Sequence, residues 1–293
     1  MLKLENVEWV HLESTTRCNA WCTGCPRNKQ GFGLADGLIE QDISVDKLTE
    51  ILNMLPSLKT IQFSGTFGDC ISGKNFIELI DLILSYDNIN NIQIHTNGSL
   101  KTTQWWIKLA YKIKHIKHGV IFALDGLEDT HAIYRQNTNF NKIIENATAF
   151  ISAGGTAIWQ FIPFEHNSHQ IKDAIKLSKK LGFSDIIFIK NRVRFHEQSF
   201  HYKTGEPIDI KPMKEVKKYN IRQNLPINSK ELVKNNKVEF ESCMHLHLKS
   251  IYVSATGKIS NCVYLLNQDY SDIEKNFEDK DWQPNCLKSC GSR

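Results

Sequence analysis

Short strand-like runs alternate with helix-like segments along the first two thirds of the chain. Each run is rich in β-branched and aromatic residues and is followed by apolar residues at helical spacing. Such alternation predicts a parallel sheet covered by helices. The first loop lacks the glycine pattern that binds a dinucleotide, which favours a partial (β/α)6 TIM-like barrel over a doubly wound sheet. The six runs are residues 7–14, 59–65, 91–98, 119–126, 156–164 and 184–190.

The sequence changes character after the sixth run. Residues 192–240 are rich in Lys, Asn and Pro and predict a linker that is helical in part. The remaining residues hold half of the eight cysteines and two strand-like runs joined by the turn "ATGK". We therefore expect an α/β barrel over 1–191, a linker over 192–240, and a small cysteine-rich domain of a β-hairpin and a helix over 241–293.

The composition is that of an ordinary globular protein. The chain has 293 residues, of which 41% are hydrophobic, enough to bury a full core. The first residues lack the basic and apolar regions of a signal peptide, and no run is long enough to span a bilayer. We therefore expect a cytoplasmic protein with no membrane partner. A net charge of +4 is too small to indicate a nucleic acid partner.

Three cysteines, Cys18, Cys22 and Cys25, fall in the loop after the first predicted strand. In a parallel barrel, the loops after the strands carry the chemistry. In a reducing compartment, closely spaced cysteines are more often metal ligands or catalysts than disulfides. A cubane iron-sulfur cluster takes one thiolate for each iron, so three cysteines leave one iron open for chemistry. A zinc knuckle or a chance cluster is the alternative.

The spacing Cys-x3-Cys-x2-Cys after a first strand resembles the signature of the radical S-adenosylmethionine (SAM) enzymes. Later motifs follow in the order typical of that family, so the resemblance extends over nearly the whole chain. It implies a [4Fe-4S] cluster on the three cysteines and a SAM site. "GTFGD", with Gly68 and Asp69, would receive the SAM ammonium group, and Arg135 the carboxylate, with Asn97 of "TNG" nearby. Taken alone, "GTFGD" also fits a plain turn, and Arg135 a surface ion pair.

The last part of the chain supplies four more cysteines. Four thiolates make a closed site, which needs no outside ligand. Their spacing resembles the twitch module, the shortened form of the SPASM domain, and implies a second, auxiliary [4Fe-4S] cluster. A structural zinc site is the alternative, because four cysteines alone do not distinguish zinc from iron-sulfur. The four are Cys243, Cys262, Cys286 and Cys290.

The resemblance implies a radical SAM oxidoreductase or maturase. Reductive cleavage of SAM would give a 5′-deoxyadenosyl radical that abstracts hydrogen from a peptide or a small molecule such as a polyol or amino sugar. The auxiliary cluster would accept the electron of an oxidation, and flavodoxin or ferredoxin would supply the first electron.

Two other classes of function stay open. One is a redox-neutral epimerase in which Cys70 donates a hydrogen atom to the substrate radical, although Cys70 also fits a buried apolar position. The other is a metal-binding scaffold without catalytic activity, which contacts a partner through the basic linker.

Overall fold

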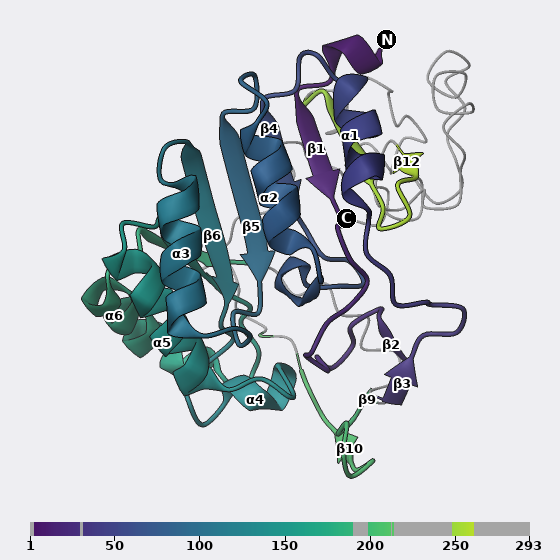
Figure 1. Ribbon diagram of the computed structural model, residues 1–293. Coiled ribbons are helices and arrows are strands. Elements are labelled where there is room, and N and C mark those ends of the chain that lie inside the picture. The colour runs from purple at the N-terminus through teal and green to yellow at the C-terminus, as the bar shows by residue number, and fades with distance from the viewer. Residues whose placement is uncertain (1–2, 30–31, 190–198, 212, 214–247, 261–293) are drawn as a thin grey trace, which may run out of the picture.

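The computed structural model describes residues 3–29, 32–189, 199–211, 213 and 248–260. Within them, eight strands form one sheet in the order β12-β11-β1-β4-β5-β6-β7-β8 (Figure 1). All neighbours are parallel except β12, which pairs antiparallel with β11. The strands are β1 (Trp9–Leu12), β4 (Thr60–Phe63), β5 (Asn91–Thr96), β6 (Lys117–Ala123), β7 (Ala157–Phe161), β8 (Asp185–Phe188), β11 (Ser250–Val253) and β12 (Ile259–Ser260).

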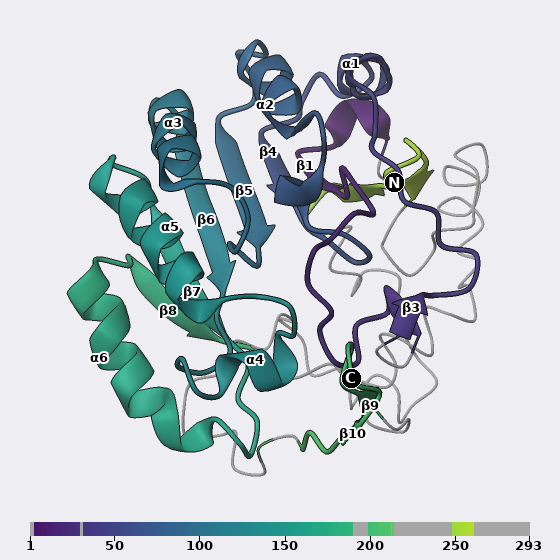
Figure 2. The ribbon, with the colours of Figure 1, turned by 60° about the horizontal axis from the view of Figure 1, so that its bottom comes forward.

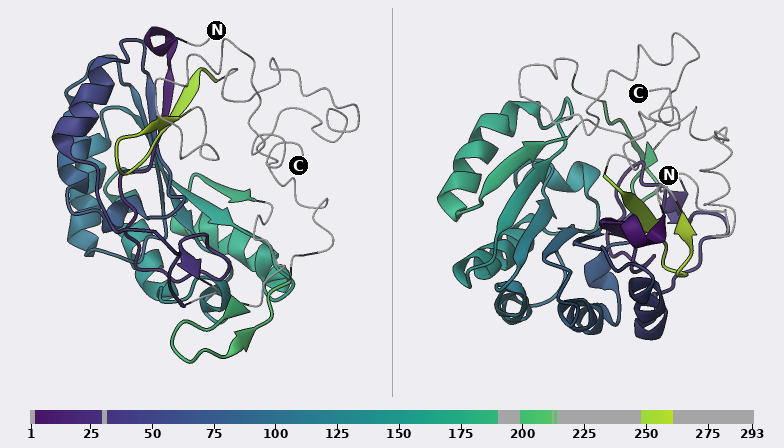
Figure 3. Two further views of the ribbon diagram at one scale, coloured as in Figure 1. Left: turned by 90° about the vertical axis from the view of Figure 1, so that its right-hand side faces the viewer. Right: turned by 90° about the horizontal axis from the view of Figure 1, so that it is seen from above.

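The six strands expected from the sequence are confirmed: five lie within their predicted runs, and β6 begins two residues before its run. Helices follow them in the chain, so the fold is of the α/β class that the alternation predicts. Seen from above, the strands follow an arc with the helices on its outer side (Figure 3). The helices are α1 (Val45–Asn53), α2 (Phe76–Leu84), α3 (Thr103–Ile113), α4 (His131–Tyr134), α5 (Phe140–Ser152) and α6 (Ile171–Leu181).

Local sequence explains where these helices start and stop. Ser44, Thr102 and Asn139 each precede a helix, and each side chain accepts a hydrogen bond from a main-chain N–H three residues later. Helix α6 ends at Gly182, whose φ of 85° is the left-handed conformation that glycine adopts without strain. None of the helices in the described part of the chain is both long and apolar enough to cross a membrane.

The outer face of the sheet and the helices share one hydrophobic core. In β5, Ile92 and Ile94 are fully buried in it, and Trp106 of α3 lies against Phe122 of β6. Trp106 also donates its indole N–H to the main-chain oxygen of Leu100 at 3.0 Å. Every second residue along a strand therefore faces the helices, and these residues form the sheet's part of the core.

The inner face of the sheet is half-buried and more polar. The residues of β5 that alternate with the core residues are Asn91, Gln93 and His95. The same alternation places His11 of β1 and Gln160 of β7 on this face. The outer face is thus apolar, whereas the inner face mixes hydrogen-bonding side chains with apolar ones such as Trp9 and Ile158.

Two short hairpins lie beyond the ends of the parallel strands, on the side to which the strand arrows point (Figures 1 and 2). The first, β2 (Asn28–Lys29) with β3 (Phe32–Leu34), follows the cysteine loop. The second, β9 (Ser199–Phe200) with β10 (Pro207–Ile208), is the described part of the segment expected as a linker. This edge of the sheet is where the chemistry of a parallel α/β fold is expected.

The strand-turn-strand unit predicted in the last part of the chain is confirmed as β11 and β12. Its place could not be read from local sequence: β11 lies parallel beside β1, with Trp9 opposite Ser250 and Leu12 opposite Val253. The four cysteines expected to hold a second cluster, and the rest of that expected domain, lie outside the described residues.

Candidate functional site

The loop after β1 brings Cys18, Cys22 and Cys25 into one small hydrophobic cluster. Cys22 is buried, and Cys18 and Cys25 are half-buried beside it. The main-chain N–H of Cys25 donates to the oxygen of Cys22 at 3.1 Å, and Gly24 between them has a φ of 72°. The loop is therefore a tight turn that gathers the three thiols. The other buried members of the cluster are Ala20, Tyr134, Ile162, Phe164 and Ile210.

The chemistry of these donors fits an iron-sulfur cluster. Burial raises the pKa of all three thiols, to about 12 for Cys25, so binding a metal must release their protons. In the described ranges, no three Cys, His, Asp or Glu side chains converge on a single metal ion. A cubane does not require such convergence, since each thiolate binds its own iron. Three soft thiolates in one loop suit iron-sulfur ligation and leave the fourth iron for another ligand.

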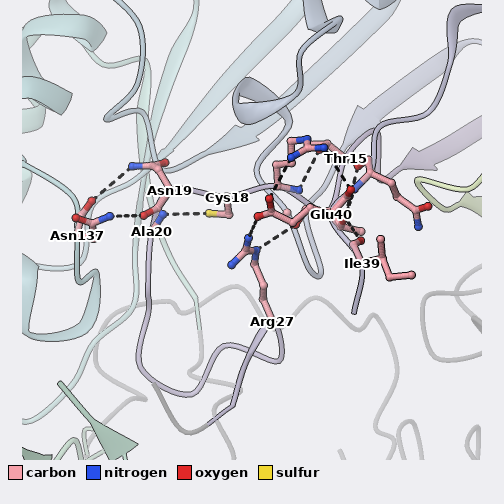
Figure 4. A network of polar contacts seen from close by, with 12 residues as sticks. Thr15, Cys18, Asn19, Ala20, Arg27, Ile39, Glu40 and Asn137 are labelled. Carbon is pink, nitrogen blue, oxygen red and sulfur yellow. Dashed lines mark hydrogen bonds and ion pairs between the residues drawn. The ribbon is translucent and has the colours of Figure 1, made fainter. Parts of the chain in front are cut away.

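Ion pairs brace the loop against residues 39–42 (Figure 4). Arg17 donates to Asp42 at 3.1 Å and to Glu40 at 3.0 Å. Glu40 also pairs with Arg27, a residue that is 2% exposed and donates to the oxygen of Thr16 at 3.1 Å. Because these contacts hold both ends of the cysteine loop, the thiols have a fixed scaffold.

Asp69 connects three loops at the ends of neighbouring strands. Its carboxylate accepts hydrogen bonds from Thr96 at 2.9 and 3.1 Å, from the N–H of Asn97 at 2.6 Å and from the N–H of Ile71 at 3.1 Å. Its own N–H donates to the oxygen of Arg17 at 2.8 Å. The side chain is 6% exposed. Asp69 therefore sits at the predicted site, with its carboxylate fully engaged by neighbouring protein groups.

Asn97, held by Asp69, reaches the cysteine loop. Its side-chain nitrogen lies 3.8 Å from the sulfur of Cys18 and 2.9 Å from the oxygen of Asn19. The structure thus brings Asn97 to the sulfur of Cys18, with Asp69 behind it.

Gly68 lies where two loops touch. A Cβ built at Gly68 would meet the main-chain oxygen of Thr15 at 1.9 Å, so this position excludes any side chain. A Cβ at Gly65 would meet the oxygen of Gly68 at 1.6 Å. Gly68 is therefore required for close approach of the β4 loop to the loop after β1, and Gly65 for the tight turn of the β4 loop itself.

Glu13 binds the main chain of the same glycine segment, a role that the sequence motifs do not indicate. One carboxylate oxygen accepts from the N–H groups of Thr66 at 3.0 Å, Phe67 at 2.5 Å and Gly68 at 3.1 Å. The other accepts from the hydroxyl of Tyr252 in β11. Because Glu13 uses these N–H groups, the segment has main-chain carbonyls left to offer to a cation such as an ammonium group.

Asp125 is a second residue whose role the sequence motifs do not indicate. It is fully buried and accepts from the guanidinium of Arg135 at 2.6 Å and from the N–H of Ile162 at 2.6 Å. Burial lowers the pKa of Arg135, but the charge of the Asp125 carboxylate raises it. The resulting pKa lies well above the usual value of arginine, so the guanidinium stays charged. Arg135 also reaches the sulfur of Cys22, at 3.7 Å.

The described part of the expected linker packs on the cysteine loop. Tyr202 stacks on Trp21 with ring centroids 6.4 Å apart, and its N–H donates to Gln136 at 2.7 Å. Gln136 in turn donates to Thr23 at 2.8 Å. The linker segment is thus part of the site's wall, which its Lys-rich and Asn-rich composition did not indicate.

A cavity of about 400 Å³ opens beside this contact. Its lining is mostly amides and hydroxyls, which suits a polar ligand group. None of the predicted cysteines, Asp69 or Arg135 lines it. The lining residues are Asn19, Ser99, Ala132, Gln136, Asn137, Thr138, Asn139, His201 and Tyr202.

Cys70, the hydrogen donor considered for an epimerase, packs in the main core and is 4% exposed. Its thiol lies 3.6 Å from the main-chain oxygen of His95 and can donate to it. This is the environment expected for cysteine used as a small apolar residue.

Neither a protein-family model nor a curated protein matches this sequence. Solved structures do match over nearly the whole chain. One is anSMEcpe with bound AdoMet, that is, SAM: 16% identity, 96% of this chain and 83% of that chain covered, TM-score 0.59. Another is Streptococcus suis SuiB bound to SAM: 13% identity, 98% and 68% covered, TM-score 0.62.

A third structure is Streptococcus suis SuiB bound to the precursor peptide SuiA, with 13% identity, 100% and 69% covered, and a TM-score of 0.59. This chain shares the fold of these SAM-bound and peptide-bound proteins. At such identities, the likeness establishes the fold alone.

Proposed function

We propose that the chain is a radical SAM enzyme that modifies a peptide. One observation carries the proposal: the three thiols of the β1 loop lie at the edge of a parallel sheet, with Asn97 and Arg135 directed at two of their sulfurs. The arc of strands would then be a partial (β/α)6 barrel whose C-terminal edge holds the site. The fold shared with SAM-bound proteins supports the proposal.

Each part of the site has a task in this proposal. Cys18, Cys22 and Cys25 hold a [4Fe-4S] cluster, which supplies the electron that cleaves SAM to a 5′-deoxyadenosyl radical. The carbonyls around Gly68 receive the SAM ammonium group, and the packed walls exclude water from the reacting atoms. Flavodoxin or ferredoxin supplies the electron, in a cytoplasm that keeps the thiols reduced.

A peptide is the proposed substrate for two reasons. A protein of the same fold has been crystallised with a precursor peptide. The inner face of the sheet offers neutral hydrogen-bonding groups, among them Gln62, His95 and Gln160, which suit the amides of a peptide. Abstraction of hydrogen from such a peptide, followed by loss of one more electron, makes the reaction an oxidation.

The electron acceptor is proposed to be a second cluster on the four cysteines of residues 241–293, in a twitch-like domain. A site closed by four thiolates has no iron open to SAM, which suits electron transfer. The four are Cys243, Cys262, Cys286 and Cys290.

The first test is anaerobic reconstitution with iron and sulfide, followed by dithionite and SAM. We expect 5′-deoxyadenosine from the wild-type protein and from Cys70→Ala, and none from Cys25→Ala. Iron, zinc and sulfide analysis separates a cluster from a zinc site. Absence of 5′-deoxyadenosine from a wild-type protein that has its full iron and sulfide would overturn the proposal.

The second test removes the auxiliary site alone, in a Cys262→Ala/Cys290→Ala variant. We expect loss of roughly four iron atoms, one cubane, while SAM is still cleaved. Oxidation of a peptide substrate should stop. Circular dichroism must first show that the variant is folded, since removal of a metal site can unfold a small domain. Unchanged iron content would contradict the second cluster, and deuterium from solvent in the product would indicate an epimerase instead.

A further inference from the structure

Two of the three cysteine sulfurs have nitrogen donors of different charge. The sulfur of Cys18 faces the neutral amide of Asn97 at 3.8 Å, while that of Cys22 faces the guanidinium of Arg135 at 3.7 Å. Charge-assisted donors interact more strongly than neutral ones, and a thiolate sulfur is a charged acceptor. The site is therefore electrostatically asymmetric.

Arg135 is held in this orientation from several sides. Its Nε donates to Asp125 at 2.6 Å, while its Nη1 is the atom near Cys22. Its guanidinium carbon lies 5.2 Å from the centre of the Tyr134 ring. The side chain is 15% exposed and that of Asp125 fully buried. Few alternative positions are open to a guanidinium fixed in this way.

Asp125 is itself fixed by the fold. Its second oxygen accepts from the N–H of Ile162 at 2.6 Å, and its N–H donates to the ring of His131 at 3.2 Å. The amide of Asn167 donates to its main-chain oxygen at 3.2 Å. Asp125 and Arg135 thus form a rigid dipole whose positive end is directed at Cys22.

We propose that Arg135, oriented by Asp125, raises the one-electron reduction potential of the cluster held by Cys18, Cys22 and Cys25, in the absence of SAM. The inference rests on the proposed function, because it requires that cluster. Reduction adds a negative charge beside the guanidinium, and a nearby cation stabilises the reduced form. Hydrogen bonds to the sulfurs and local charge are known determinants of such potentials. The weak screening of a buried site strengthens the effect.

This assignment differs from the one implied by the family resemblance, in which Arg135 binds the SAM carboxylate. A residue that acts only on SAM leaves the potential of the SAM-free protein unchanged. A residue that acts on the Cys22 sulfur changes it. The two roles are therefore separable by a measurement made without SAM.

The experiment is a redox titration of the reconstituted full chain without SAM, followed by electron paramagnetic resonance. In Arg135→Gln, we expect the ratio of reduced to oxidised cluster at the wild-type midpoint to fall about tenfold, a shift of ~59 mV to lower potential. In Asp125→Asn, which keeps an oxygen for Arg135 but removes the opposing charge, the midpoint should rise. The opposite signs distinguish the dipole from a general loss of structure.

Lys142→Gln is the control for the loss of one positive charge. Lys142 lies on α5, outside the candidate site, and pairs with the exposed Glu145 at 3.3 Å. Its midpoint should stay at the wild-type value. If Arg135→Gln does not assemble its cluster, Arg135→Lys replaces it in the titration, because lysine keeps the cation. The midpoint of Arg135→Lys should lie closer to the wild-type value than to the value expected for Arg135→Gln.

An unchanged midpoint in Arg135→Gln with intact iron content would overturn the inference, and weaker SAM binding in that variant would then assign Arg135 to the carboxylate. A fall in the midpoint of Asp125→Asn would also contradict it. Failure of the proposed function is a different result, since a wild-type protein without a cluster gives no signal to titrate.

Discussion

The two faces of the sheet carry different kinds of residue on the same strands. Outside, Ile94 of β5 and Phe122 of β6 are fully buried under the helices. Inside, His95 of β5 lies one residue away from Ile94, with its ring 3.1 Å from the amide of Gln62. One residue along a strand thus separates a packing position from a hydrogen-bonding position.

This difference separates stability from chemistry. Burial of large apolar side chains against helices stabilises the fold, while the inner face and the edge of the sheet keep polar groups in fixed positions. Substitutions on the outer face should therefore change the free energy of unfolding, and substitutions at the inner face and edge should change the chemistry.

The strongest test of this separation is Cys22→Ala. The variant should lose SAM cleavage entirely, because two thiolates cannot hold the proposed cluster with one iron free. Its unfolding transition without metal should stay close to that of the wild type, since Cys22 belongs to the small cluster near the edge and not to the main core. Normal yield of 5′-deoxyadenosine under reducing conditions would show that the ligand assignment is wrong.

The converse test is Trp106→Ala on the outer face. Trp106 is fully buried and lies against Phe122 and Phe150. Its truncation should lower the free energy of unfolding by about 3–5 kcal/mol, measured by denaturant titration. SAM cleavage per folded molecule should be retained, with Trp106→Phe as the milder control. A well-folded variant that has lost cleavage would contradict the separation.

A third test concerns Asp69, which lies at the edge of the sheet where the strands end. In Asp69→Asn, one oxygen becomes an NH2 group, so the N–H of Asn97 or the hydroxyl of Thr96 loses an acceptor. An unpaired buried group costs about 1–3 kcal/mol of stability. SAM affinity, measured by calorimetry on the reconstituted protein, should change little if main-chain carbonyls bind the ammonium group. A larger fall in Asp69→Asn would give the carboxylate itself a direct role.

The smallest effect is expected from His95→Gln on the inner face. Burial lowers the pKa of His95 from 6.5 to about 4. Below pH 6.5 the unfolded chain binds a proton there that the folded chain does not bind, so stability falls as the pH falls toward 4. The wild type should lose up to roughly 1.4 kcal/mol per pH unit from this residue in that window.

His95→Gln should remove that part of the pH dependence, seen in denaturant midpoints at pH 7 and pH 5.5. His11 and His131, whose pKa values are also lowered by burial, keep their own contributions. The exposed His115→Gln serves as the control. An unchanged slope in His95→Gln would mean that the imidazole is not held neutral by the inner face.

Local sequence predicted the strands well because each is a short run of apolar residues bounded by turn-forming residues. It also named Cys18, Asp69 and Arg135, which the fold does place at one edge. It could not predict that Asp125 orients Arg135, since the two side chains meet only through the α4 turn. Nor could it predict that β11 pairs with β1, because a parallel pairing between strands so far apart in the chain leaves no local pattern.

The position of β11 has a consequence for synthesis of the protein. β1 pairs with β4 on one side, but its other side is completed only by residues 249–253, which are synthesised long after β4. At a translation rate of roughly 5–20 residues per second, that delay is on the order of ten to fifty seconds. For that time β1 is a sheet edge, open to pairing with another chain. Glu13, at the start of the cysteine loop, meanwhile lacks its partner Tyr252. We therefore expect chaperones, or a low local concentration, to limit aggregation of the nascent protein during this interval.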